Sequence, residues 1–250
     1  MKIIWQIDPE DIAKVKAFFD EHKDNHFVKT RITTNLGFDK SPISEDVFWD
    51  RMVGCLLTTQ QRSGPESSVT KFLLTRPPPL DHNTCNEQDN LAEFARKVLS
   101  DFGGLRRSTT IGKELATNLS FLNDEGWEST FQHLDEVRLN SSPATERKAA
   151  AFIDENFKGF GPKQSRNLLQ GLGLSRYEIP IDSRITKWLN ALGFPVKLTA
   201  NALQDRNYYN FVSDGFQQLC EACQTMPCVL DAAIFSSFDE GKWTEENVVW

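Results

Sequence analysis

The stretch "KGFGPKQSRNLLQGLGLSRYEIPIDSR", residues 158–184, decides how this chain folds. Two glycines enclose Phe160, and Pro162 and Lys163 follow at once. Proline is favoured at the first position of a helix, where its missing N–H removes no hydrogen bond. Apolar residues have helical spacing in "TERKAAAFIDENF" before the turn and in "PKQSRNLLQGLG" after it. The stretch therefore predicts two helices joined by a short turn.

The glycine turn has two interpretations. Gly159 and Gly161 suit a backbone that needs positive φ or a close neighbour, and the ring of Phe160 is expected to fill the core. The N–H groups of the turn and of the second helix's first residues would then face one way, which favours binding of a nucleic-acid phosphate. The alternative is an ordinary corner between two helices, with a glycine cap and no ligand.

Lys163 is unusual because it occupies the first turn of a predicted helix. The helix dipole disfavours a cation there by roughly 0.3–1 kcal/mol. The same field favours the free amine, and partial burial would lower the lysine pKa further, so that the amine could act as a nucleophile. The alternative is a solvated surface lysine, the usual state of this residue type.

Asp182 follows Pro180 and stands directly before the helical pattern "SRITKWLNALG". This position predicts a helix N-cap that remains ionised at pH 7. A fixed carboxylate could also stabilise a cation that develops beside it. Both roles are compatible, and capping alone is the alternative.

The segments "FKGFGPKQSRNLL" and "IPIDSRITKWL" together resemble the helix–hairpin–helix and Gly/Pro, Asp signature of the DNA base-excision glycosylases. The lysine and its interval to the aspartate are similar to the 8-oxoguanine branch, and the short chain resembles its compact prokaryotic forms. The resemblance implies a mostly α fold with a cleft between two mainly helical subdomains. One would comprise residues 1–45 and 195–250, and the other residues 46–194, with the helix–hairpin–helix at about 144–173.

The resemblance also implies a bifunctional activity, removal of an oxidised purine such as 8-oxoguanine followed by cleavage of the abasic site. Lys163 would attack C1′ of the sugar, Asp182 would stabilise the positive charge on the sugar ring, and the Schiff base would allow β-elimination. Chemistry on a base requires its extrusion from the duplex, at a cost of a few kcal/mol. The partner is therefore expected to be double-stranded DNA that contains a damaged base.

Three further segments resemble parts of the family that contact DNA. "MVGCLLTTQQ", residues 52–61, resembles the helix that ends in a residue filling the gap left by the extruded base, and "FGGLRRS", residues 102–108, resembles the loop that supplies a wedge. "PCVLDAAIFSSF", residues 227–238, is similar to the late helix near the base pocket. The implied DNA contacts are Gly159, Phe160, Gly161, Gln60, Gln61, Arg62, Leu105, Arg106 and Arg166. The candidates for the base pocket are Asn167, Phe235, Phe238, Trp243 and Trp250.

The distribution of charge along the chain indicates whether it can bind nucleic acid, and the cysteines indicate whether it can bind a metal. The net charge of the 250-residue chain is −7, which taken alone argues against nucleic-acid binding, but residues 158–187 carry a net +4 and predict a local basic face. Cys220, Cys223 and Cys228 lack a fourth ligand for a metal, so free buried thiols are expected, with no metal and no cofactor. The odd number of cysteines fits a reducing cytoplasm, and the absence of a long apolar run argues against a membrane span. We also expect a monomer that is nucleoid-associated in a prokaryote.

Other elements are predicted from local signals. Helices should begin after Asp8 and after Ser44, and residues 76–90, which begin with a run of prolines, should form a polar loop. Strand candidates are "MKIIWQI", "HFVKTRITT" and "FPVKL". Three alternatives to the oxidised-purine enzyme remain open, namely a glycosylase or lyase for another lesion, a non-catalytic helix–hairpin–helix module that only holds DNA, and a helical scaffold for protein partners.

Overall fold

A computed structural model describes residues 4–37, 41–239 and 242–248. Helices dominate, and no strand occurs within these ranges, so the mostly α class is confirmed. The three strand predictions fail there. Residues 4–7 and 194–198 have no regular structure, residues 26–34 are helical, and the first residues of "MKIIWQI" lie outside the described ranges.

Helix α2 (His26–Leu36) is the clearest departure from the sequence pattern. Its threonines, Val28 and Ile32 favour a strand by propensity. However, the side chain of Asn25 accepts a hydrogen bond from Phe27 N, which caps a helix, and the buried residues Phe27, Arg31 and Asn35 repeat at helical spacing. Tertiary packing of this face against α13 (Pro227–Ser237) outweighs the local preference.

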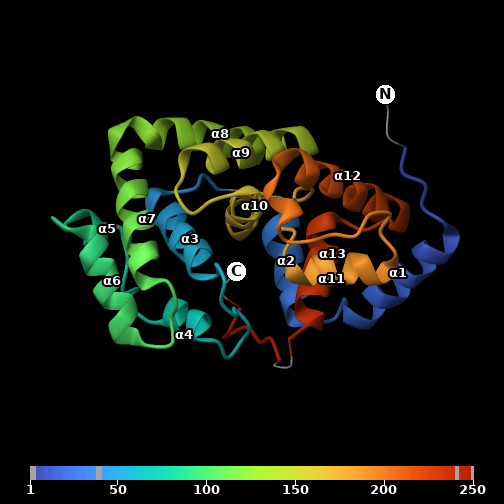
Figure 1. Ribbon diagram of the computed structural model, residues 1–250, viewed down its shortest axis with the longest axis horizontal. Helices are drawn as coiled ribbons and strands as arrows, with labels where there is room; N and C mark the ends of the chain where they lie inside the picture. The colour runs from blue at the N-terminus through green and yellow to red at the C-terminus, as the bar shows by residue number, and fades with distance from the viewer. Residues whose placement is uncertain (1–3, 38–40, 240–241, 249–250) are drawn as a thin grey trace.

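One half of the molecule is a helical bundle, which Figure 1 shows on the left with α10 near the centre. Its shared hydrophobic core extends from Phe48 to Leu174 along the chain. The segment predicted as a loop at residues 76–90 contains a short helix, capped by Asp81. The bundle elements are α3 (Glu45–Leu57), α4 (Ser68–Leu74), α5 (His82–Asn86), α6 (Leu91–Phe102), α7 (Ser108–Phe121), η1 (Leu122–Gly126), α8 (Trp127–Leu139), α9 (Pro143–Asn156) and α10 (Pro162–Gly171).

The other half is built from both chain ends and lies on the right of Figure 1. Two adjoining apolar clusters form its core, and Phe18 and Phe19 pack against both of them. Asp8 and Pro9 begin α1, as predicted. Its elements are α1 (Pro9–His22), α2, α11 (Ser183–Leu192), η2 (Ala202–Gln204), α12 (Arg206–Cys223) and α13 (Pro227–Ser237).

The packing divides the chain earlier than residue 194. Ile185 and Leu189 of α11 are buried in the core formed with the chain ends, whereas the core of the bundle ends at Leu174. On this criterion α11 belongs with the terminal half. The catalytic candidates Lys163, on α10, and Asp182, before α11, therefore come from opposite halves.

Residues 175–181, which we call the strap, connect the two halves without helix or strand. Glu146 of α9 is fully buried, and its carboxylate accepts hydrogen bonds from the backbone N–H groups of residues 176, 177 and 178. The hydroxyl of Tyr209 accepts from Ile181 N and donates to Ile179 O. Buried side chains thus satisfy backbone groups of the strap and fix the point at which Asp182 begins α11.

Candidate active site and nucleic-acid interface

The hairpin between α9 and α10 uses its two glycines differently. Gly159 has φ +84°, and a Cβ there would lie 2.5 Å from Leu56 Cδ2 and 2.8 Å from Glu114 Cδ, so any other residue would be strained and would displace these side chains. Gly161 has ordinary φ, and a Cβ would meet nothing within 4 Å. The backbone at Gly161 therefore remains open to an approaching phosphate. Phe160 is buried in the bundle core, as predicted.

This difference gives a matched pair of substitutions. Gly159→Ala should destabilise the protein by about 2–3 kcal/mol, because the methyl group is both conformationally strained and overpacked. Gly161→Ala should change the free energy of unfolding by less than about 1 kcal/mol, yet weaken DNA binding, because its methyl group fills the open face. Urea denaturation and DNA titration measure the two effects. Equal stability losses would contradict this assignment.

Lys163 is the second residue of α10, in the first turn as predicted, and is partly buried. Its Nζ donates to Gln164 Oε1 at 3.1 Å. Gln164 is held in turn by hydrogen bonds from its Nε2 to Cys55 O and to Thr59 Oγ1, both at 2.6 Å. Burial lowers the pKa of Lys163, and the negative charge of Asp182 acts in the opposite direction. The amine is thus fixed in place and easier to deprotonate than a surface lysine.

Asp182 caps α11, which confirms the predicted cap. Its Oδ1 accepts hydrogen bonds from Arg184 N at 2.7 Å and Ile185 N at 3.1 Å. Its other oxygen accepts from Arg184 Nη1 at 3.4 Å. The carboxylate is held at a helix N-terminus, where the dipole favours its negative charge, and it acts electrostatically on Lys163.

Asp231 is a site residue that the sequence analysis missed. It is 4% exposed on α13, accepts a hydrogen bond from Gln170 Nε2 at 2.8 Å, and interacts electrostatically with Lys163 and Asp182. Burial raises its pKa to about 6, against the opposing effects of Arg31 and Gln170. One signal could have revealed it, because it is the lone charge in the apolar helix "PCVLDAAIFSS".

The base-pocket candidates occupy different environments. The ring of Phe235 stacks on Phe27 at 4.9 Å, and the guanidinium of Arg184 lies 4.0 Å from its centroid. Phe238 is 43% exposed, whereas Trp243 is buried and donates to Asp239 Oδ2. The ring of Phe235 therefore already packs against Phe27, Arg184 and Trp243.

Asn167 lies one helical turn after Lys163 on α10. Its Nδ2 contacts Cys55 Sγ at 3.4 Å and Gln164 Oε1 at 3.2 Å. It therefore lines the interface between α10 and α3. Trp250 lies outside the described residues.

The two segments predicted to enter the duplex lie side by side. The Nε2 of Gln61 donates to Leu57 O at 2.6 Å, and its Oε1 accepts from Arg106 N at 2.8 Å. Gln60 is exposed and has φ 59°, unusual for a residue other than glycine. Arg62 is also exposed. Of the two wedge candidates, Leu105 packs against the bundle core and Arg106 is exposed, which favours Arg106.

Arg166 is not placed to contact DNA, contrary to the expectation from its charge. It is 4% exposed, its guanidinium donates to Glu178 Oε2 at 2.6 Å and to Asn210 Oδ1 at 2.9 Å, and it lies over the ring of Tyr209. Burial alone would raise the pKa of Glu178, but Arg166 and Arg147 outweigh it and hold that pKa below its usual value. Arg166 is therefore an internal counterion that joins α10 to the strap and α12.

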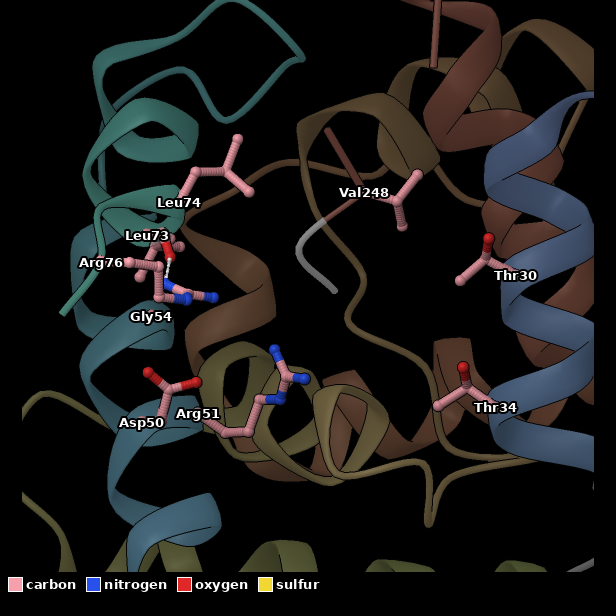
Figure 2. Close-up of a pocket in the computed structure, with 9 residues that line it drawn as sticks. All are labelled: Thr30, Thr34, Asp50, Arg51, Gly54, Leu73, Leu74, Arg76 and Val248. Carbon is pink, nitrogen blue, oxygen red and sulfur yellow. Dashed lines mark hydrogen bonds between the residues drawn. The ribbon is translucent and has the colours of Figure 1, made fainter. Parts of the chain in front are cut away.

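A pocket of about 260 Å³ opens between α2 and α3, and so between the two halves (Figure 2). Arg51 extends into it from α3, and Thr30 and Thr34 lie on the opposite wall. The C-terminal segment contributes Val248. A cleft between the halves is therefore present.

Within the described ranges, no cluster of histidine, cysteine and acidic residues is arranged to hold a metal. All five cysteines are buried, and none forms a disulfide bond. The thiol of Cys55 is near Lys163, but burial raises its pKa to about 12, so it stays neutral. No helix in the described part of the chain has the length and hydrophobicity of a membrane span.

Solved structures show which fold this is. The 8-oxoguanine DNA glycosylase of Methanocaldococcus jannaschii matches with a TM-score of 0.66 at 16% identity, over 93% of this chain and 95% of that chain. A complex of the 8-oxoguanine glycosylase/lyase of the same organism with a 15mer DNA containing 8-oxoguanine matches with a TM-score of 0.68 at 15% identity, over 92% and 100%. The 8-oxoguanine DNA glycosylase of Thermotoga maritima gives 0.65 at 12% identity, over 94% and 99%.

The chain therefore has the compact 8-oxoguanine glycosylase fold, as the resemblance implied. Neither a protein-family model nor a curated protein matches the sequence.

Proposed function

We propose that this protein is a base-excision DNA glycosylase with abasic-site lyase activity, and that 8-oxoguanine is its principal substrate. The observation that carries the proposal is the environment of Lys163, a partly buried amine with a lowered pKa, held beside a capped aspartate in this fold. A module that only holds DNA needs neither group. The neighbour that was solved with DNA containing 8-oxoguanine supports DNA with a damaged base as the partner.

In the proposed mechanism, the exposed side chains of Gln60 and Arg106 stabilise the duplex from which the damaged nucleotide has been extruded. Backbone N–H groups at Gly161 and the start of α10 bind a phosphate, so that affinity depends little on sequence and falls with salt. Gln60 and Arg106 act from adjacent positions because Gln61 joins their segments.

The chemical step begins when the Lys163 amine attacks C1′ and the C–N bond to the base breaks, with the bonding electrons leaving on the base. Asp182 stabilises the positive charge that develops on the sugar. Loss of a proton and opening of the sugar ring then give a Schiff base between Nζ and C1′. This Schiff base acidifies the C2′ proton, and β-elimination then breaks the C3′–O bond, so that the strand on the 3′ side leaves with a 5′ phosphate.

Borohydride reduction tests the proposal directly. The protein is incubated with duplex DNA carrying one 8-oxoguanine, and in parallel with a duplex carrying one abasic site, before reduction. We expect a covalent protein–DNA band with both duplexes. A band with the abasic duplex alone would support the lyase activity and would mean that the protein excises a base other than 8-oxoguanine. No band on either duplex would refute the catalytic lysine and leave a DNA-binding module or a protein scaffold.

Asp182→Asn should separate two effects of this carboxylate. Asparagine caps a helix about as well as aspartate, so the fold should be retained. Loss of the negative charge lets the pKa of Lys163 fall further, so the amine is free at lower pH. The pH profile of trapping on a preformed abasic site should therefore shift to lower pH, while 8-oxoguanine excision falls by about 10²- to 10³-fold. Single-turnover rates from pH 5 to 9 measure both effects, and an unshifted profile would contradict the coupling.

A further inference from the structure

Gln164 is a buried polar side chain between the candidate nucleophile and the end of α3. It is 7% exposed on α10. Its Oε1 accepts hydrogen bonds from Lys163 Nζ at 3.1 Å and from Asn167 Nδ2 at 3.2 Å. Its Nε2 donates to Cys55 O and to Thr59 Oγ1, both at 2.6 Å. Both ends of the amide are therefore engaged within the protein.

These partners fix which way the amide of Gln164 points. A backbone carbonyl such as Cys55 O can only accept, so the NH₂ end must face it and the oxygen must face Lys163. A neutral amine has two N–H donors and one lone pair. When an N–H of Lys163 is donated to Oε1, the lone pair points away from the amide and stays available for attack. The reverse orientation would direct an amide N–H at the lone pair and mask it.

The other end of Gln164 holds the turn that follows α3. Thr59, whose hydroxyl accepts from Gln164 Nε2, directly precedes Gln60. Gln60 is exposed with φ 59°, and the proposed mechanism uses its side chain to stabilise the emptied duplex. The hydroxyl of Thr58 lies farther from Nε2, at 3.3 Å. One side chain therefore contacts both the nucleophile and the turn that carries Gln60.

Gln164 thus joins two parts of the site that act in sequence. Extrusion of the nucleotide, which Gln60 stabilises, has to precede attack of the amine on C1′. We propose that Gln164 is a positioning residue, which orients the amine of Lys163 and holds it in register with the turn that carries Gln60. This inference rests on the proposed function and deepens it, because it assigns a residue that acts on the reaction only through the nucleophile.

Gln164→Met tests the role of the amide, because methionine has a similar length and makes none of these hydrogen bonds. Cys55 O keeps the hydrogen bond from Thr58 Oγ1 at 2.8 Å, so this carbonyl retains a donor. Single-turnover trapping on a preformed abasic duplex should slow by about 10- to 100-fold. The Kd for a duplex with a tetrahydrofuran abasic analogue, which cannot form a Schiff base, should stay within about twofold.

The pH profile of trapping separates orientation of the amine from a structural role. A hydrogen bond to Oε1 favours the ammonium, so Gln164→Met should move the midpoint to lower pH. Gln164→Glu places a negative charge beside the ammonium, which raises the pKa of Lys163 and should move the midpoint to higher pH. Neither substitution changes the other charged or titratable groups that act on this amine, which are Asp182, Arg184, Asp231 and Cys55.

A double-mutant cycle tests the link to the turn. Thr59→Val removes the hydroxyl with little change of shape and should slow trapping by about 3- to 10-fold in the wild-type background. In the Gln164→Met background it should change the rate by less than about twofold, because the hydrogen bond is already lost. Thr117→Val is the matched control on the exposed side of α7, where the hydroxyl bonds only Lys113 O, and it should trap like the wild type.

The outcomes distinguish this inference from the proposed function. Wild-type trapping by Gln164→Met, or a uniform loss at every pH with no shift of the midpoint, would overturn the positioning role. Additive losses in the double mutant would show that Thr59 acts independently and would overturn the link to the turn, and this arm stands even if Gln164→Met lowers the melting temperature. A wild-type protein that traps no abasic duplex would refute the proposed function, and the role of Gln164 with it.

Discussion

Lys163→Gln should abolish covalent trapping on both 8-oxoguanine and abasic duplexes and should reduce strand cleavage by at least ~10³-fold. Lys163 contacts Gln164 and interacts electrostatically with Asp182, and glutamine cannot form a Schiff base. Affinity for duplex DNA should fall much less, because the proposed phosphate contacts are made by backbone N–H groups at the hairpin, which this substitution leaves in place.

The same substitution should not lower stability. The folded-state pKa of Lys163 lies below its usual value, so the charged form is disfavoured in the fold. This cost is present below the folded-state pKa and disappears only as the pH rises above the ordinary lysine pKa. Replacing the ammonium by a neutral amide removes the cost at pH 7, and the melting temperature should be equal or higher. Lys187→Gln, on the exposed side of α11, is the matched control and should trap normally. Retained trapping by Lys163→Gln would overturn the assignment of the nucleophile.

Arg166→Met should cost about 3 kcal/mol of stability, which corresponds to a melting temperature lower by about 6–12 °C for a chain of this size. The carboxylate of Glu178 is fully buried, and removal of Arg166 takes away its most buried counterion. Arg147, which also pairs with Glu178, keeps the loss near the lower end of the range for broken buried ion pairs.

Arg147→Met is the matched comparison because it pairs with the same carboxylate from a side chain that is 29% exposed, against 5% for that of Arg166. We expect a loss of about 1 kcal/mol for this variant. Urea denaturation gives the free energies of unfolding, and DNA titrations at several salt concentrations give the number of phosphate contacts. A salt slope reduced by about one in Arg166→Met, with unchanged stability, would restore Arg166 to the DNA interface.

Local signals in the sequence were sufficient for most helix starts and for the centre of the site. Asp8, Ser44, Pro162 and Asp182 each mark the start of a helix in the structure. The side chains of Ser44 and Asp182 accept hydrogen bonds from backbone N–H groups of the first turn, whereas the side chain of Asp8 accepts none. The burial of Phe160 followed from its place between two glycines.

Features that depend on distant partners could not be predicted in this way. Helix α2 has the composition of a strand, and its helical state reflects packing against α13. The charge of Arg166 suggested DNA because nothing in the chain order reveals that Glu178 is its buried partner. Asp231 joins the site only because α13 folds back against α10 through Gln170. The family resemblance predicted that both Gln61 and Arg106 contact DNA. The hydrogen bond between Arg106 N and Gln61 Oε1 could be found only in the structure.

The strap has a consequence for how this fold tolerates sequence drift. Glu146 accepts hydrogen bonds from three backbone N–H groups of the strap. Tyr209 accepts a hydrogen bond from one backbone N–H of the strap and donates one to a backbone carbonyl. Backbone groups are common to nearly all residue types, so many replacements within residues 175–181 preserve these bonds. The sequence constraint falls instead on two side chains outside the strap and on Glu178 within it, whose carboxylate is buried against Arg166. The other strap positions can therefore change while Asp182 stays in register, as long as Glu146, Glu178 and Tyr209 are kept.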